Sequence, residues 1–111
     1  MARNIKLFVY PVKDIDAAKA FYSRYLGVEP YADSAYYVGF RIGDQEIGLD
    51  PHSQVGPIAY VDVDDIKASL KELLDAGASS VADIKDVGGG LLIVQVKDAS
   101  GNVLGLRQPV K

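Results

Sequence analysis

Apolar residues recur at helical spacing in two segments of the chain, each preceded by an aspartate and followed by a glycine. Asp14 and Asp65 stand where helix N-caps belong, because an aspartate side chain accepts bonds from amides that have no helical partner. Gly27 and Gly77 are suited to the left-handed conformation that ends a helix. The residues predicted to share a buried helix face are Ile15, Ala18, Tyr22, Tyr25 and Leu26 in the first segment, and Ile66, Leu70, Leu73 and Leu74 in the second.

Short runs rich in β-branched and aromatic residues surround both helices and predict strands. One run precedes each helix, at 4–10 and at 57–63. Two runs follow each helix, 35–42 with 46–50 and 91–97 with 102–107, and a weaker signal lies at 28–33 and at 79–84. The turn residues "GDQ" and "DASGN" join the two later runs into hairpins.

The two halves of the chain share one plan, since Asp65 follows Asp14 by 51 positions and Gly77 follows Gly27 by 50. This repeat predicts an α+β protein in which a β-α-β-β-β module occurs twice along the chain. With 111 residues the chain is long enough for one domain. We therefore predict a single domain, 1–111, with one module over 1–54 and the other over 55–111.

The repeated plan resembles the glyoxalase, bleomycin resistance protein and extradiol dioxygenase superfamily, also called the vicinal oxygen chelate superfamily. The resemblance is carried by "VKDIDAAKAFYSRYLG", "VDVDDIKASLKELLDAG" and above all "KDASGNVLGLRQ". It implies that the eight strands of the two modules form a half-open, barrel-like sheet around one cleft, with the helices outside. It also implies a homodimer, with modules paired within one chain or exchanged between two.

The resemblance further implies where a metal ion would be held in the metalloenzymes of this superfamily. A His or Gln on the first strand and a Glu on the last strand of each module are the ligands there, and these positions correspond to Leu7, Ile58, Gly48 and Gly105. None of these side chains binds a divalent cation. His52 is the only histidine and falls in the joint between modules, where we expect a surface residue. We predict no metal and no cofactor, and neither glyoxalase I nor ring-cleaving dioxygenase activity.

Strand side chains alternate between two faces, so the same positions predict which side chains line the cleft. If glycines replace ligands at 48 and 105, we expect open space there, and a leucine at Gly105 should block a ligand while leaving the fold largely intact. Polar residues are expected to surround an apolar floor. The predicted cleft residues are Leu7, Val9, Tyr37, Arg41, Glu46, Gly48, Ile58, Tyr60, Asp62, Ile93, Gln95, Val103, Gly105 and Arg107.

Composition and short motifs exclude several other classes of function. The net charge is -3, whereas nucleic-acid-binding domains are usually basic, so we do not expect a nucleic-acid partner. The apolar run near the N-terminus is too short for a signal peptide or a membrane span, so we expect a cytoplasmic protein without a membrane partner. With no cysteine there is no thiol nucleophile. The glycines at 88–90 lack the Lys and Ser or Thr of a phosphate-binding loop, and we interpret them as a mobile flap.

Three functions remain open at this point. The first is a metal-free protein that binds a small organic molecule, in the manner of antibiotic or metabolite sequestration. The second is a metal-independent lyase, isomerase or dioxygenase-like enzyme, with Tyr60 or Asp62 as acid or base and Arg41 or Arg107 orienting an anionic substrate. The third is a dimeric regulatory or interaction protein. Tyr31, Tyr36 and Tyr37 either stack on a flat ligand or pack within their own hairpin.

Overall fold

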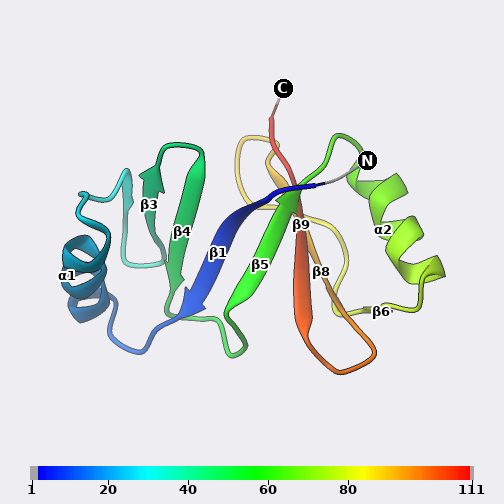
Figure 1. Ribbon diagram of the computed structural model, residues 1–111, viewed down its shortest axis with the longest axis horizontal. Coiled ribbons are helices and arrows are strands. Elements are labelled where there is room, and N and C mark those ends of the chain that lie inside the picture. Colours follow the sequence, from blue (N-terminus) through cyan, green and yellow to red (C-terminus); the bar gives the residue numbers. More distant parts are fainter. Residues whose placement is uncertain (1–2, 111) are drawn as a thin grey trace. The chain divides into compact units, whose positions relative to one another are not determined.

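The computed structural model describes residues 3–110, which form two compact units that we describe separately. One unit is Lys6–Ile58, and the other begins at Ala59 and includes the few residues before Lys6. Each unit contains one helix and a set of strands (Figure 1). The predicted α+β class is confirmed. The predicted boundary between residues 54 and 55 stays a prediction.

Both helices begin at the aspartates that the sequence indicates. In α1 (Ile15–Leu26) the Asp14 carboxylate accepts bonds from the amides of residues 16 and 17, and Gly27 ends the helix with φ 74°. In α2 (Ile66–Asp75) the Asp65 carboxylate accepts from the amide of residue 68. Ala76 caps the C-terminus of α2, and Gly77 follows it with φ 109°. Aspartate caps and glycine stops therefore define both helices, as predicted.

The strands of the Lys6–Ile58 unit run in the order β2-β3-β4-β1. Their bounds are β1 (Ile5–Pro11), β2 (Ala32–Asp33), β3 (Val38–Ile42) and β4 (Gln45–Asp50). The hairpin pair β3 and β4 is antiparallel, whereas β1 pairs with β4 in parallel. The first and last strands of the module are thus neighbours within one chain.

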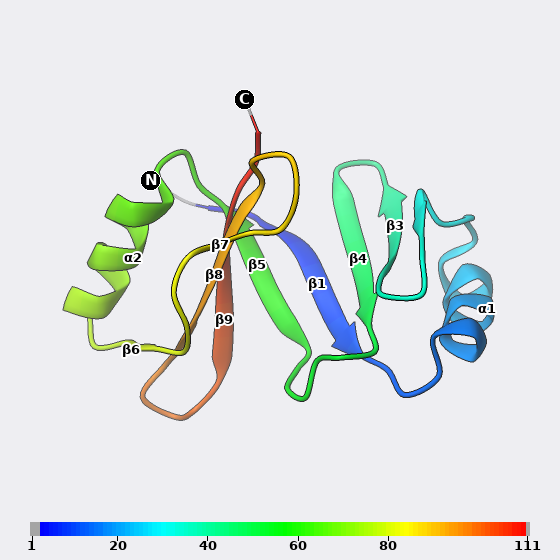
Figure 2. The same cartoon turned by 180° about the vertical axis from the view of Figure 1, so that it is seen from behind.

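The second unit repeats this arrangement with one additional short strand. Its strands are β5 (Ile58–Asp62), β6 (Ser79–Ser80), β7 (Lys85–Asp86), β8 (Leu92–Lys97) and β9 (Val103–Gln108). β5 pairs in parallel with β9, β9 pairs antiparallel with β8, and both β6 and β7 pair with β8 (Figure 2). The described residues therefore contain nine strands, and the predicted count of eight is wrong. The extra strand arises because residues 81–84 face only residues 94–95 of β8, which interrupts the pairing.

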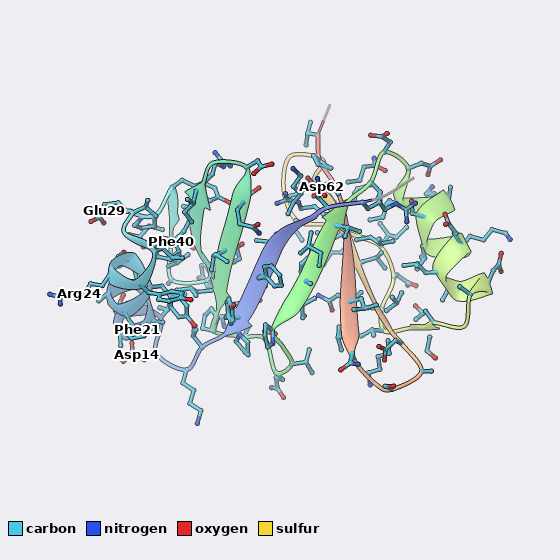
Figure 3. The ribbon with its side chains drawn as sticks, viewed as in Figure 1. Asp14, Phe21, Arg24, Glu29, Phe40 and Asp62 are labelled. Atoms are coloured by element: carbon cyan, nitrogen blue, oxygen red, sulfur yellow. The ribbon has the colours of Figure 1, made fainter. Side chains whose placement is uncertain are left out.

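Each helix covers one face of its own strands with an apolar cluster. Val38, Phe40 and Leu49 are fully buried beneath α1, and Phe40 is labelled in Figure 3. Val63, Ile66, Val94 and Leu106 form the corresponding cluster with α2. The members of these clusters on β3, β4, β8 and β9 alternate with the predicted cleft residues of the same strands, which therefore lie on the opposite sheet face.

Two residues predicted for the buried helix faces are not in these clusters. Tyr25 is 73% exposed and Leu74 is 38% exposed. Both lie at the flank of their helix's apolar face, where helical spacing alone does not decide burial. Tyr22 packs against the α1 cluster as predicted, and burial raises the pKa of its hydroxyl.

Candidate functional site

The sheet face turned away from α1 is organised in rows of paired residues. Strand register places Leu7 beside Glu46 and Glu46 beside Arg41, and it places Val9 beside Gly48 and Gly48 beside Gly39. Paired residues in neighbouring strands point to the same side of a sheet. The first row therefore carries charged groups, and the second row carries two adjacent positions without side chains.

Tyrosine rings cover both glycines of that second row. A Cβ atom added to Gly48 would lie 2.6 Å from Cζ of Tyr37 and closer still to its hydroxyl oxygen. A Cβ atom added to Gly39 would lie 2.9 Å from Cε2 of Tyr31. Tyr37 is half-buried and comes from the segment just before β3, so its predicted place in a strand that begins at residue 35 is wrong, since β3 begins at Val38. The glycines provide room for tyrosines of the same unit.

The same arrangement occurs in the second unit. Tyr60 on β5 is paired with Gly105 on β9, and a Cβ atom at Gly105 would lie 2.7 Å from Cγ of Tyr60. The ring is only 3% exposed, and its hydroxyl accepts a 2.7 Å hydrogen bond from Nε2 of Gln95, the next residue in the row. The expectation that Gly48 and Gly105 leave open space is therefore wrong. Aromatic side chains fill the volume that a residue at either position would need.

Tyr31 connects the charged row to the glycine row. Its amide donates to the carbonyl of Gly39, which places the ring over that residue, and its hydroxyl donates to Oε1 of Glu46 at 2.7 Å. The guanidinium carbon of Arg41 lies 4.1 Å from the ring centroid, within range of a cation–π interaction. Nη2 of Arg41 is also 3.9 Å from Oε1 of Glu46. The sequence leaves two roles open for Tyr31, stacking on a flat ligand or packing within its hairpin, and the structure shows contacts with β3 and β4 of the hairpin. Gly39 in the middle of β3 is the sequence signal that a ring lies there.

Arg41 combines this fixed position with exposure. Its side chain is 55% exposed, whereas that of Glu46 is 14% exposed. Within residues 3–110 no side chain or carbonyl accepts a hydrogen bond from the Arg41 guanidinium. Arg41 thus presents several N–H donors to solvent from a guanidinium already held in place.

Asp62 and Arg107 form the other charged pair among the predicted site residues. Register places them side by side on β5 and β9, with Ile93 of β8 next to Arg107. Nε and Nη2 of Arg107 donate to Oδ1 and Oδ2 of Asp62 at 2.7 and 3.2 Å. The Asp62 carboxylate therefore accepts hydrogen bonds from one guanidinium through both of its oxygens, which is the geometry of a structural pair.

The remaining predicted cleft residues are apolar. Leu7, Val9 and Ile58 are buried, and Ile93 and Val103 are half-buried.

His52 is exposed, and its ring stacks on that of Tyr36 at 6.2 Å between centroids. The amides of Gly88 and Gly90 donate to the Asp86 carboxylate, so the glycine loop surrounds a side chain of its own unit.

The residues at the family's metal positions do not fit a divalent cation. Leu7, Ile58, Gly48 and Gly105 have no donor atoms in their side chains, and tyrosine rings cover the two glycines. Between residues 3 and 110, no three His, Cys, Asp or Glu side chains gather in a way that could hold a metal ion.

A family model of the "Glyoxalase/Bleomycin resistance protein/Dioxygenase superfamily" matches residues 4–106. The chain belongs to this superfamily, as its sequence motifs predict. No sequence among curated proteins matches it. No helix in the part of the chain that the structure describes is long and apolar enough to span a membrane.

Solved structures of low sequence identity share the fold. A hypothetical protein from Bacillus halodurans C-125 has a TM-score of 0.81 at 14% identity, covering 100% of this chain and 97% of that one. Methylmalonyl-CoA epimerase from Mycobacterium tuberculosis has a TM-score of 0.76 at 19% identity, covering 96% and 87%. A Mn(II)-bound glyoxalase from Novosphingobium aromaticivorans has a TM-score of 0.72 at 20% identity, covering 97% of this chain and 40% of that one.

Proposed function

We propose that this protein binds a small organic molecule that carries an acidic group, and that it does so without a divalent metal. The observation that carries the proposal is the Arg41 guanidinium, which is fixed over the Tyr31 ring, exposed to solvent and not used as a hydrogen-bond donor within residues 3–110. A carboxylate takes two parallel bonds from such a group. Tyr31 is 46% exposed and offers ring surface beside it.

Because the Tyr31 ring already restricts Arg41, this side chain loses less conformational entropy when a ligand binds. A free arginine side chain loses rotamer freedom when it binds a ligand, whereas this one is already restricted by Tyr31 and Glu46. Oε1 of Glu46, which accepts from the Tyr31 hydroxyl, lies 3.9 Å from Nη2 of Arg41, beyond hydrogen-bond distance. An incoming carboxylate at hydrogen-bond distance would therefore interact with Arg41 more strongly than Glu46 does.

Binding is favoured over metal-independent catalysis by the contacts of the two candidate catalytic groups. The Tyr60 hydroxyl is buried and accepts from Gln95, and the Asp62 carboxylate is bound by Arg107. A general acid or base must reach the proton of a substrate, and both groups are instead engaged with neighbouring strands. We therefore assign Tyr60 and Asp62 to support of the sheet face.

A thermal-shift screen tests the binding proposal. Aromatic carboxylates should be compared with their primary amides, which keep the shape and remove the charge. A carboxylate at about 100 times its dissociation constant should stabilise the protein by about 2.7 kcal/mol, and its amide should not. Arg41→Gln should abolish the shift, whereas Lys67→Gln, an exposed change on α2, should preserve it. Equal shifts with acids and amides, or a full shift with Arg41→Gln, would contradict the proposal.

Metal content is tested separately. After incubation with Zn, Ni, Mn or Fe and exhaustive dialysis, elemental analysis should find far less than one metal ion per chain. Stoichiometric metal would overturn the metal-free part of the proposal. If a ligand found in the screen is consumed on incubation, and Tyr60→Phe or Asp62→Asn stops its consumption, the protein is an enzyme.

A further inference from the structure

The exposed guanidinium of Arg41 has an acidic neighbour in the same row of the sheet face. Register pairs Arg41 on β3 with Glu46 on β4, so both side chains point to the same side of the sheet. Nη2 of Arg41 lies 3.9 Å from Oε1 of Glu46, which is too long for a hydrogen bond but within the range of an ion pair. A ligand held by Arg41 therefore also meets the charge of Glu46.

The carboxylate of Glu46 acts against a ligand that carries only an acidic group. A ligand oxygen that accepts from Nη2 of Arg41 at about 2.9 Å lies at most about 7 Å from Oε1 of Glu46. This separation is shorter than the Debye length of about 8 Å at physiological ionic strength, so the two negative charges repel each other. A simple carboxylate is attracted by Arg41 and repelled by Glu46. A positive group on the same ligand would turn that repulsion into attraction.

Glu46 is held in place by the same ring that holds Arg41. Its Oε1 accepts a 2.7 Å hydrogen bond from the Tyr31 hydroxyl, and the guanidinium of Arg41 lies over the Tyr31 ring. The Glu46 side chain is only 14% exposed, which leaves it little room to turn away from Arg41. An ionised carboxylate has about four acceptor sites, so it can accept from a ligand in addition to Tyr31. One tyrosine thus positions both charges.

An α-amino acid has the dimensions that this pair of charges requires. Its ammonium nitrogen lies about 3 Å from its nearer carboxylate oxygen, because three covalent bonds separate the two atoms. When the carboxylate binds Arg41 and the ammonium binds Glu46, each at hydrogen-bond distance, the four groups form a closed ring of alternating charge. The 3.9 Å between Nη2 and Oε1 completes this ring without movement of either side chain.

We propose that the acidic ligand of this site is an α-amino acid, bound through its carboxylate by Arg41 and through its ammonium by Glu46. The inference rests on the proposed function, which assigns the acidic group of the ligand to Arg41. It adds a second, positively charged group at a defined distance from the first. Phenylalanine is a suitable probe, because Tyr31 is 46% exposed and offers ring surface to its side chain.

Isothermal titration calorimetry with three ligands of one skeleton tests the proposal. L-Phenylalanine should bind the native chain at least about tenfold more tightly than 3-phenylpropanoate, which lacks the amine. N-Acetyl-L-phenylalanine, whose nitrogen carries no charge, should bind no better than 3-phenylpropanoate. If 3-phenylpropanoate or another aromatic carboxylate of the thermal-shift screen binds at least as tightly as phenylalanine, the inference is wrong although the proposed function stands. If neither phenylalanine nor any carboxylate of the screen binds, both are wrong.

The Glu46→Gln variant makes the test specific for the ammonium group. Glutamine keeps a side-chain oxygen that accepts from the Tyr31 hydroxyl, and it removes the negative charge. Phenylalanine should bind this variant at least about tenfold more weakly than the native chain, whereas 3-phenylpropanoate should bind it more tightly because the repulsion is gone. An equal loss of affinity for both ligands would mean that Glu46 only supports the fold, and it would overturn the proposal.

Two further variants provide the controls. Glu29→Gln removes the same charge from an exposed position of the same unit and should change neither affinity. Arg41→Gln should abolish the binding of both ligands, since their carboxylates share one partner. Circular dichroism and Tm verify that each variant is folded. If Glu29→Gln weakens phenylalanine binding as much as Glu46→Gln does, net charge and not the Glu46 carboxylate selects the ligand, and the proposal fails.

Discussion

The contact between Gly105 and Tyr60 makes a quantitative prediction about stability. A Cβ atom at Gly105 would lie 2.7 Å from Cγ of Tyr60, whereas carbon atoms normally approach to about 3.5–4.0 Å. Cδ1 and Cε1 of the ring would be closer still, so the ring must move by more than about 1 Å, although it is 3% exposed and is held by Gln95 through its hydroxyl. Gly105→Ala is a small change in sequence that disturbs a buried side chain.

The expected cost is the difference between two effects. Overpacking of a buried site costs about 1–3 kcal/mol. Replacing glycine in a strand interior recovers about 0.5–1 kcal/mol of backbone entropy. Together these ranges give a loss of about 0–2.5 kcal/mol in the free energy of unfolding for Gly105→Ala, and we expect the upper half of that range because the buried ring must move. The sequence-based expectation that a leucine at this position leaves the fold intact is contradicted by the same contact.

A double-mutant cycle with Tyr60→Ala isolates the contact, using urea denaturation followed by circular dichroism. Tyr60→Ala alone should cost about 3–4 kcal/mol, because a buried ring is lost. In the Tyr60→Ala background, Gly105→Ala should be neutral or stabilising by about 0.5 kcal/mol. The coupling energy is then about 2 kcal/mol. Gly39→Ala is the matched control and should cost less, since the Tyr31 ring above it is 46% exposed, whereas Tyr60 is buried. A Gly105→Ala variant that is more stable than the native chain, or equally destabilised with and without Tyr60, would refute this reasoning.

Three further predictions concern charged groups. Arg107→Met should lower the free energy of unfolding by about 2 kcal/mol, because it leaves the half-buried Asp62 carboxylate without its guanidinium; chemical denaturation measures the loss, and no loss would contradict the assigned role. Asp65→Ala should cost about 1 kcal/mol while Asp65→Asn costs little, since asparagine also caps a helix; equal losses in Tm would argue against capping. Hydrogen bonds from the Asn102 side chain and amide lower the pKa of Asp98 below its usual range, so NMR titration should show that Asn102→Ala raises it. Because the folded-state pKa is lowered, the stability contributed by Asp98 is present above its unfolded pKa and is lost as pH falls through the folded value.

Local patterns were sufficient for the elements of the fold. Asp14 and Asp65 cap the helices because capping depends on neighbours two or three residues away, which the sequence states directly. Alternation together with the polar character of Arg41 and Gln95 likewise indicated which face of β3 and β8 is turned away from the helix, and their neighbours Phe40 and Val94 are in the clusters beneath the helices. The family followed from the repeat and its motifs, because a duplicated plan is visible without any structure.

Long-range packing decided what the local patterns could not. Tyr25 has the spacing of a core residue, yet only the position of α1 on its sheet determines that this ring faces solvent. What lies over Gly48 and Gly105 also depends on residues of other segments, Tyr37 and Tyr60. From the sequence alone, a glycine at a position where relatives carry a metal ligand predicts open space in the cleft.

The sequence by itself determined the helices, the main strands, the repeated plan and the loss of donor atoms at the four metal positions. Only the tertiary structure decided what occupies the volume beside the two glycines, and it places Tyr37 and Tyr60 there. The physical reason is that a glycine in a strand leaves a volume without a side chain. Strand register and the neighbouring rings then decide which side chain fills that volume. In this protein those neighbours are tyrosines, and the fixed, exposed guanidinium of Arg41 is a consequence of the same kind of packing at Gly39.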